Sequence, residues 1–203
     1  MSSTNRGYER HKRDYYFTPV SEIENFLNDF LKYESNALDG QIVDPCAGGD
    51  RTRDMSYPKA IKKVSNRWED ILTIDIREDS KANVIRDYLE YNLLFEPDCI
   101  ITNPPFRIAL GENYNRFTDR KIGIIEKALK DVRENGWVIM LLRLNFFGTQ
   151  DRKTFWDKYM PKYVFVHHQR ISFTGDGNTD SIEYAHFCWQ KGNYPTESKL
   201  KVI

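Results

Sequence analysis

Short apolar segments alternate with segments of helical periodicity along most of the chain, and this alternation restricts the fold more than any other feature. The apolar segments predict strands at Gln41–Asp44, Asp70–Ile76, Cys99–Thr102, Trp137–Leu144, Tyr163–His167 and Tyr184–Gln190. The periodic segments predict helices at Ser21–Tyr33, Tyr57–Asn66, Lys121–Glu134 and Phe155–Tyr159. Strands that alternate with helices predict an α/β fold in which helices cover both faces of a mainly parallel central sheet.

The end of the chain departs from this alternation. Residues Ile171–Glu183 separate the last two predicted strands and are rich in Gly, Asp, Asn and Thr, without a helical period. Because no helix connects these two strands, we expect them to pair as an antiparallel C-terminal hairpin at one edge of the sheet. Local signals also predict helix limits: Ser21 and Glu24 form a capping box at the start of the first helix, and Asn135-Gly136 terminates the third.

Size and composition fit one domain. The 203 residues include 30 basic and 30 acidic side chains, so the net charge does not by itself indicate a polyanionic partner. We expect a single domain over residues 1–203, in which residues 1–14 form a flexible basic arm. This polar start does not resemble a signal peptide, and no apolar run approaches the roughly 20 residues of a membrane helix. We therefore expect a cytoplasmic protein without a membrane partner.

Cysteine and histidine residues show no metal-ligand spacing. Cys46, Cys99 and Cys188 are far apart and form no CxxC pair, which argues against a disulfide framework and against a structural zinc site. The histidines also lack metal-ligand spacing to any cysteine or acidic residue. We therefore expect no metal ion and a reducing compartment.

The most informative motif is the turn Asn103-Pro104-Pro105-Phe106, which directly follows a predicted apolar strand. Each proline fixes its own backbone and disfavours helical geometry in the residue before it, so the turn is rigid and extended. Ligands of open α/β sheets bind at the carboxyl ends of the strands. The turn therefore presents a side-chain amide, a carbonyl and a phenyl ring where a ligand is expected.

A second motif follows the strand at Gln41–Asp44. The sequence Asp44-Pro45-Cys46-Ala47-Gly48-Gly49-Asp50 combines a strand that ends in an acidic residue with a pair of glycines. Glycine permits tight turns and a close approach of the backbone to a ligand. The next strand again carries an acidic residue, Asp75, near its end.

Together and in this order, these motifs resemble those of S-adenosylmethionine-dependent amino-methyltransferases, in particular small phage-type DNA N6-adenine methyltransferases. The resemblance spans about Tyr15 to Trp189 and implies a Rossmann-like methyltransferase fold. It implies a catalytic turn consisting of Asn103, Pro104, Pro105 and Phe106. In that turn the Asn103 side-chain oxygen and the Pro104 carbonyl accept hydrogen bonds from the target amino group, and Phe106 stacks on its ring. Catalysis then rests on positioning rather than on a strong base.

The resemblance also implies a binding site for S-adenosylmethionine. The implied loop residues are Asp44, Pro45, Cys46, Ala47 and Gly48. Asp75 is implied to bind both ribose hydroxyls, with Ile76 beside it, and Asp87 with Tyr88 to contact the adenine. The family commonly has glycine at the position of Asp50, and this chain departs from the pattern there. Aspartate can still adopt left-handed geometry more easily than most residues.

Two further segments extend the resemblance. Before the first strand, Tyr15-Tyr16-Phe17-Thr18-Pro19 resembles a motif of DNA adenine methyltransferases, which implies that Tyr16, Phe17 and Thr18 contact the methionine end of the cofactor. Downstream, Gln169–Gly175 resembles a segment of the small phage-type enzymes. It implies that Arg170 and Phe173 flank the target-base pocket, although Phe173 fits a core position equally well.

The implied activity is methyl transfer from S-adenosylmethionine to the N6 amino group of adenine in DNA, with the adenine turned out of the duplex. Two alternatives stay open: an RNA adenine or guanine N-methyltransferase, and a catalytically inactive methyltransferase-like subunit that binds nucleic acid. Candidate recognition segments are the basic arm, Arg107–Arg120 and Ser172–Ser181. A homodimer or a separate specificity partner also stays open, and a phage-encoded enzyme would act in the host cytoplasm.

Overall fold

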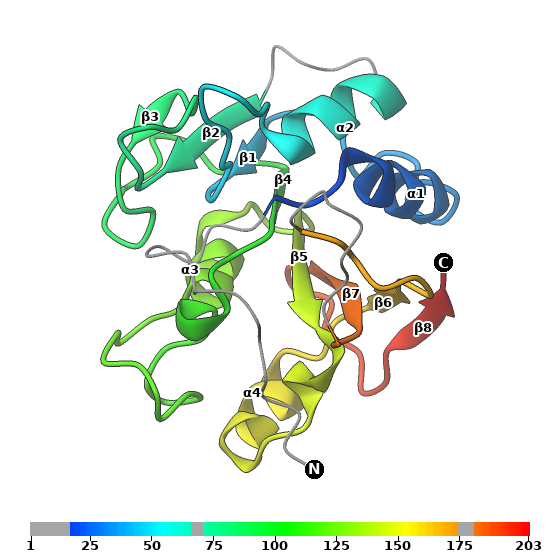
Figure 1. Ribbon diagram of the computed structural model, residues 1–203. Helices are drawn as coiled ribbons and strands as arrows, with labels where there is room; N and C mark the ends of the chain where they lie inside the picture. The colour runs from blue at the N-terminus through cyan, green and yellow to red at the C-terminus, as the bar shows by residue number, and fades with distance from the viewer. Residues whose placement is uncertain (1–16, 66–70, 174–180) are drawn as a thin grey trace.

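The computed structural model describes residues 17–65, 71–173 and 181–203, which form one mixed sheet with helices around it (Figure 1). The strand order is β3-β2-β1-β4-β5-β7-β6-β8. The strands are β1 (Ile42–Asp44), β2 (Ile71–Asp75), β3 (Val84–Ile85), β4 (Cys99–Thr102), β5 (Trp137–Arg143), β6 (Tyr163–Val166), β7 (Tyr184–Gln190) and β8 (Lys199–Val202). The α-helices are α1 (Val20–Phe30), α2 (Ser56–Ser65), α3 (Ile124–Asp131) and α4 (Lys153–Lys158). The basic arm predicted for residues 1–14 lies outside the described residues.

The sheet is parallel from β3 to β5. Strand β1 pairs in parallel with β2 and β4, and β4 pairs in parallel with β5, so their carboxyl ends share one edge of the sheet. Strand β7 pairs antiparallel with both β5 and β6. The predicted antiparallel hairpin is therefore confirmed. Its expected place at the edge of the sheet is wrong, because β8 pairs in parallel with β6 beyond the hairpin.

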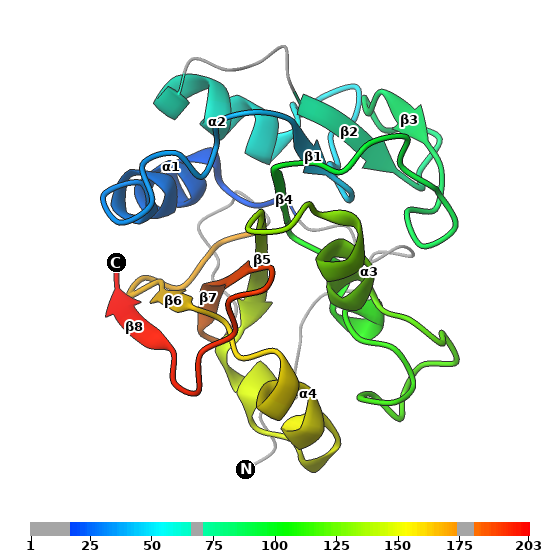
Figure 2. The same cartoon turned by 180° about the vertical axis from the view of Figure 1, so that it is seen from behind.

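Alternate residues of the central strands enter two separate hydrophobic clusters. In β1, Ile42 packs with residues of α1 and α2, whereas Val43 packs with residues of α3 and α4. Figures 1 and 2 show α1 and α2 side by side and α3 and α4 away from them. The prediction of helices on both faces is confirmed. Strand β5 is a continuous apolar run because helices cover both faces of the sheet at this strand.

The first helix differs from its prediction at the N-terminus. Helix α1 begins directly after Pro19, so Ser21 lies inside the helix and forms no cap. Glu24, the other half of the predicted capping box, instead pairs with Lys63 of α2 at 2.6 Å. A contact between two helices thus replaces the local contact that the sequence suggested.

The third helix is shorter than predicted. Helix α3 ends at Asp131, because Val132 already has extended backbone angles. Asn135 has a positive φ of 62° and belongs to the turn that leads into β5, rather than to the end of the helix. At the other end, Glu126 accepts hydrogen bonds from the backbone N of Gly111 at 2.6 Å and of Gly123 at 2.8 Å. These bonds fix the start of the helix to the preceding loop.

Strands β3 and β8 were not predicted. Strand β3 contains only Val84 and Ile85, which are half-buried, and it is too short to show a period. Strand β8 has the sequence Lys-Leu-Lys-Val and is largely exposed at the edge of the sheet. Charged and short edge strands limit unwanted pairing with other chains, and the same features remove the apolar signal.

Four side chains form a continuous hydrogen-bonded chain on the face covered by α1 and α2. Tyr57 Oη of α2 lies 3.0 Å from His186 Nε2 on β7, and His186 Nδ1 lies 2.9 Å from His167 Nε2. His167 Nδ1 in turn lies 3.2 Å from a carboxylate oxygen of Glu22 on α1. With His186 neutral and protonated on Nδ1, its Nδ1 donates to His167 and its Nε2 accepts from Tyr57. The chain ties both helices to the strands they cover.

This chain predicts a pH-dependent contribution to stability. Burial lowers the pKa of His186 well below 6.5, and His167 adds to the effect. The unfolded chain therefore binds a proton at acid pH that the folded protein does not, so this contribution is present above about pH 6.5 and is lost as the pH falls. In urea unfolding, the stability difference between wild type and His186→Gln should shrink by up to about 1.4 kcal/mol per pH unit below about pH 6.5. An equal difference at about pH 5 and about pH 8 would contradict this assignment.

Candidate active site

A cavity, called here the main cavity, lies at the carboxyl ends of β1, β2 and β4. Turns after these strands, the segment before α1 and the start of α2 form its walls. The predicted site residues that line it are Phe17, Thr18, Pro45, Cys46, Ala47, Gly48, Asp75, Ile76, Asp87, Tyr88, Asn103 and Pro105. The fold thus brings together motifs that are far apart in the sequence. Tyr16 lies outside the described residues.

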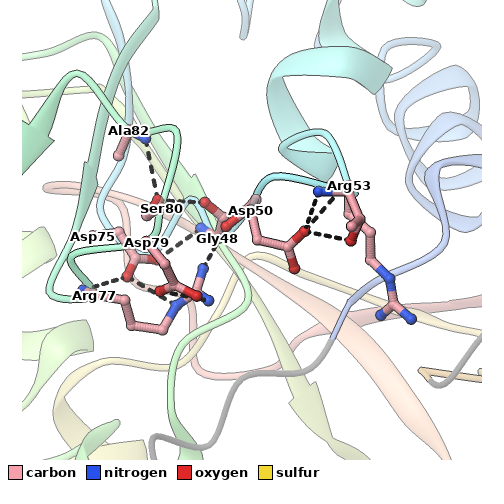
Figure 3. A network of polar contacts seen from close by, with 10 residues as sticks. Gly48, Asp50, Arg53, Asp75, Arg77, Asp79, Ser80 and Ala82 are labelled. Atoms are coloured by element: carbon pink, nitrogen blue, oxygen red, sulfur yellow. Dashed lines mark hydrogen bonds and ion pairs between the residues drawn. The ribbon is translucent and has the colours of Figure 1, made fainter.

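Asp75 at the end of β2 holds the loop that follows β1 (Figure 3). Its Oδ2 accepts a hydrogen bond from Gly48 N at 2.8 Å. Its Oδ1 accepts two from Arg77, from the backbone N at 2.8 Å and from Nε at 3.2 Å. The Arg77 guanidinium also donates to the Gly49 carbonyl at 2.7 Å. Gly48 and Gly49 have φ values of 67° and 72°, which side chains rarely permit. One buried carboxylate therefore fixes a left-handed double turn.

Asp50, where the chain departs from the family pattern, does not use left-handed geometry. Among the described residues, Asn135 is the only non-glycine with a positive φ. Asp50 Oδ1 instead accepts hydrogen bonds from Thr52 N at 2.7 Å and from Arg53 N at 2.9 Å (Figure 3). The two glycines before Asp50 already form the sharp turn. The Asp50 side chain instead closes the following turn through Thr52 and Arg53.

Asp44 at the end of β1 is fully buried and only partly satisfied. Its Oδ1 accepts a hydrogen bond from Cys46 N at 3.3 Å, and the Thr102 side chain of β4 is close enough to lower its pKa, although Oδ2 makes no well-formed hydrogen bond among the described residues. Burial raises the pKa of the Asp44 carboxyl to about 7, and the charge of Asp75 adds to the rise. A buried carboxylate is costly to ionise without a compensating partner. The loop therefore carries a buried carboxyl group next to Pro45 and Cys46, which line the main cavity.

Asp87 and Tyr88 follow β3 and are held by different partners. Asp87 Oδ1 accepts a hydrogen bond from Leu89 N at 3.0 Å, and its Oδ2 pairs with Arg120 at 2.9 Å. Tyr88 Oη donates to Asp131 of α3 at 2.9 Å. Arg120 belongs to the segment that the sequence suggested for recognition, yet the structure places it on the wall of the main cavity.

The turn after β4 is tied to the segment before α1. Asn103 Nδ2 donates to Thr18 Oγ1 at 3.0 Å, and this contact orients the amide. Thr18 is buried, with 2% of its surface exposed. The amide oxygen of Asn103 is thereby left to accept a hydrogen bond. Pro104 is buried beneath the turn, and Pro105 lines the main cavity.

Phe106 lies on the other side of this turn and lines a second cavity. The residues around the second cavity are Phe106, Arg107, Asn115, Phe117, Arg143, Asn145, Phe146, Gly148, Thr149 and Arg152. The Arg143 guanidinium lies over the Phe106 ring, 4.9 Å from its centroid. The Tyr184 ring centroid lies 5.9 Å from that of Phe106. The turn predicted from the sequence thus contributes Asn103 and Pro105 to the main cavity and Phe106 to the second cavity.

Arg170 and Phe173, the residues expected to flank the target base, line neither of these cavities. Arg170 pairs with Glu183 at 3.5 Å on the surface. Phe173 is 8% exposed and packs edge-on against Tyr184, with ring centroids 4.9 Å apart. Because Tyr184 also contacts Phe106, the structure places Phe173 in the core beneath the turn.

Several residues of the main cavity were missed by sequence reasoning: Ser56, Tyr57, Arg77, Ile108, Arg120 and Ile124. Arg77 carried a detectable signal, because a cation two residues after Asp75 is well placed to pair with it. Tyr57 and Arg120 reach the cavity only through tertiary packing, which no local pattern reveals.

Two searches of the described residues gave no result. No group of three or more His, Cys, Asp or Glu side chains is placed to hold a metal ion in that part of the chain. No helix within the described ranges is long and apolar enough to cross a membrane.

No family model matches this sequence, and neither does any curated protein. Solved structures do resemble the fold. A protein from Listeria monocytogenes proposed to be a class I S-adenosylmethionine-dependent methyltransferase aligns with a TM-score of 0.64 at 15% identity, over 92% of this chain and 65% of its own. The M protein of the type I restriction enzyme EcoKI aligns with a TM-score of 0.53 at 17% identity, over 92% of this chain and 48% of its own.

A protein from Pyrococcus horikoshii proposed to be an RNA methyltransferase aligns with a TM-score of 0.60 at 14% identity, over 93% of this chain and 94% of its own. The chain therefore spans less than two thirds of the first two structures and nearly all of the third. At these identities the likeness concerns the fold. The chain has the Rossmann-like fold of S-adenosylmethionine-dependent methyltransferases, as predicted.

Proposed function

We propose that the chain is a methyltransferase that uses S-adenosylmethionine to methylate the N6 amino group of adenine in DNA. The observation that carries this proposal is the Asn103 amide, which lines the main cavity and is held by Thr18 at 3.0 Å, in the same turn whose Phe106 lines the second cavity. The main cavity suits the methyl donor, and the second cavity suits the target adenine. The amide oxygen suits an amino group that must be held still.

The residues around the main cavity fit the cofactor. A carboxylate has about four acceptor positions, of which Asp75 uses three, so one remains on its Oδ2 for a ribose hydroxyl. Asp87 accepts one hydrogen bond on each oxygen and retains capacity for an adenine amino group. A positively charged ligand in the main cavity would favour the ionised form of the Asp44 carboxyl, whose pKa burial raises to about 7. When bound, the cofactor supplies an activated methyl group.

The catalytic turn acts by orientation. An aromatic amino group is a poor nucleophile because its lone pair is delocalised into the ring. The Asn103 side-chain oxygen and the Pro104 carbonyl accept its two hydrogens, which favours the geometry in which the lone pair faces the main cavity. The nitrogen releases one proton to water after the new carbon–nitrogen bond has formed. Preorganised acceptors of this kind lower the barrier without a strong base.

Two observations favour DNA over other substrates. The Phe17-Thr18-Pro19 segment that resembles DNA adenine methyltransferases is in direct contact with the catalytic turn. The M protein of a type I restriction enzyme is among the structures with this fold. An RNA N-methyltransferase is the second candidate, because the Pyrococcus horikoshii structure matches this chain over nearly its whole length. An inactive subunit is disfavoured, since the turn and the carboxylates of the main cavity are all present.

The substrate assignment is tested by product analysis. The protein should be incubated with isotope-labelled S-adenosylmethionine and with single-stranded DNA, double-stranded DNA or RNA in separate reactions. Digestion to nucleosides and mass spectrometry should then identify N6-methyladenine from DNA. Labelled guanine, or label in RNA alone, would contradict the DNA adenine assignment.

We expect the ionised Asp44 carboxylate to lower the stability of the protein and to favour cofactor binding. Because its pKa rises from 3.8 to about 7 on folding, its contribution to stability is full below pH 3.8 and is lost as the pH rises toward 7. Asp44→Asn stays neutral, so its stability relative to wild type should increase by up to about 4 kcal/mol between about pH 4 and about pH 8. The same variant should bind S-adenosylmethionine more weakly by calorimetry. If the stability of Asp44→Asn relative to wild type does not change with pH, Asp44 is not a buried group that ionises near pH 7.

Thr18 should act as a positioning residue for Asn103. Thr18→Val keeps the shape but removes the acceptor of the Asn103 amide, so kcat measured at saturating cofactor should fall by about tenfold or more. Thr18→Ser keeps the hydroxyl and should restore most of kcat. If Thr18→Val and Thr18→Ser have the same kcat, the hydrogen bond does not position the amide.

A further inference from the structure

Three arginines give the second cavity a positive charge, and the described residues offset it only through the nearby charge of Asp151 on Arg152. Arg107, Arg143 and Arg152 line the cavity, and none of its lining residues is acidic. Among the described residues, no ion pair joins these three arginines to a carboxylate; Asp151, next to Arg152, pairs instead with Arg116 at 2.8 Å. The cavity therefore differs from the main cavity, where arginines are paired with aspartates.

Two of these arginines are buried in part and incompletely bonded. Arg143 Nε and Arg152 Nε are buried and have no hydrogen-bond partner among the described residues. Arg152 donates through a terminal nitrogen to the Phe146 carbonyl at 2.8 Å, and its guanidinium lies 4.0 Å from the Phe146 ring centroid. Burial lowers the pKa of Arg152 below its ordinary value. A guanidinium held in this way lacks the charged acceptor that it normally binds.

The position of Arg143 links the charge to the substrate. Its guanidinium covers the Phe106 ring, 4.9 Å from the centroid, where a substrate ring would stack. A ring that enters and stacks there displaces the guanidinium, which then requires an anion nearby. A nucleotide brings both groups at once, because the phosphodiester is covalently joined to the base that stacks.

We propose that the second cavity binds the phosphodiester that flanks the target nucleotide, with Arg143 and Arg152 as its principal ligands and Arg107 at its rim. Guanidinium forks match phosphate oxygens in geometry as well as in charge. The exposed aromatic ring of Phe117 suits a neighbouring base. The enzyme would then select a polynucleotide over a free nucleoside, because the nucleoside lacks the anion. This inference rests on the proposed nucleic-acid substrate and adds the phosphodiester as the group by which the enzyme recognises that substrate.

The test compares a charged and a neutral linkage at one place in the substrate. A short oligothymidine strand with one central adenine is prepared with ordinary phosphodiesters or with methylphosphonates on the two linkages that flank the adenine. Wild type should bind the neutral strand about tenfold more weakly. Arg152→Gln should bind the ordinary strand about tenfold more weakly and lose most of the further response to methylphosphonate. Its binding should also show a salt dependence reduced by roughly one unit of slope.

Lys153→Gln is the matched control, because this neighbouring cation is exposed, pairs with Asp157 and does not line the cavity. It removes the same charge and should retain the methylphosphonate response. Arg107→Gln changes an exposed residue, so its weaker phosphate response can be measured without risk to the fold. Arg152→Lys should retain most of the salt slope if the charge, rather than the packing on Phe146, binds the strand.

The outcomes separate the two proposals. If wild type neither binds nor methylates any oligonucleotide, the nucleic-acid function is wrong, and the phosphate site fails with it. If wild type methylates the strand but Arg152→Gln and Arg107→Gln respond to methylphosphonate as wild type does, only the phosphate site is overturned. Competition by polyglutamate as strong as that by oligothymidine would assign the cavity to an acidic peptide and also overturn it.

Discussion

The Asp75 carboxylate at the end of β2 is the contact on which the rest of the site depends. It binds Gly48 N and two nitrogens of Arg77, and Arg77 in turn binds the Gly49 carbonyl. These bonds join the loop after β1 to the loop after β2. The two parallel strands are therefore connected beyond the end of their own hydrogen-bond ladder. Removing the carboxylate would leave a buried guanidinium and a buried N–H without their acceptor, which is far more costly than a missing surface contact.

The turn Asn103–Phe106 is held in a similar way at the end of β4. Two prolines limit its backbone, and the hydrogen bond from Asn103 to Thr18 anchors its side chain to the segment before α1. The turn, which contributes to both cavities, is therefore rigid. Asp44, next to the wall of the main cavity, and Arg152, on the wall of the second, each bury a polar atom without a hydrogen-bond partner among the described residues. Buried polar atoms of this kind are typical of functional positions, where ligands supply the missing partners.

The sequence predicted those parts of the fold and site that depend on local chemistry. The strand and turn around Asn103 follow from apolar runs and from proline, and the loop after Asp44 follows from a glycine pair. The rest depends on tertiary contacts: Glu24 leaves its expected cap to bind Lys63, and Arg143 reaches Phe106 from a different strand. Strand β8 escaped prediction because its charged, exposed edge sequence carries no apolar signal. The roles of the individual site residues stay predictions, since position alone does not show binding.

The central claim is that the main cavity binds S-adenosylmethionine through Asp75, and calorimetric titration tests it most directly. Wild type should bind one equivalent of the cofactor, and Asp75→Asn should reduce affinity by about tenfold or more because a charge-assisted acceptor is lost. Asp79→Asn is the control, because Asp79 lies on the same loop and contacts the same Arg77, yet it is exposed and does not line the cavity. Its affinity should match that of wild type. No heat of binding in folded wild type, or equal affinity in all three proteins, would contradict the account.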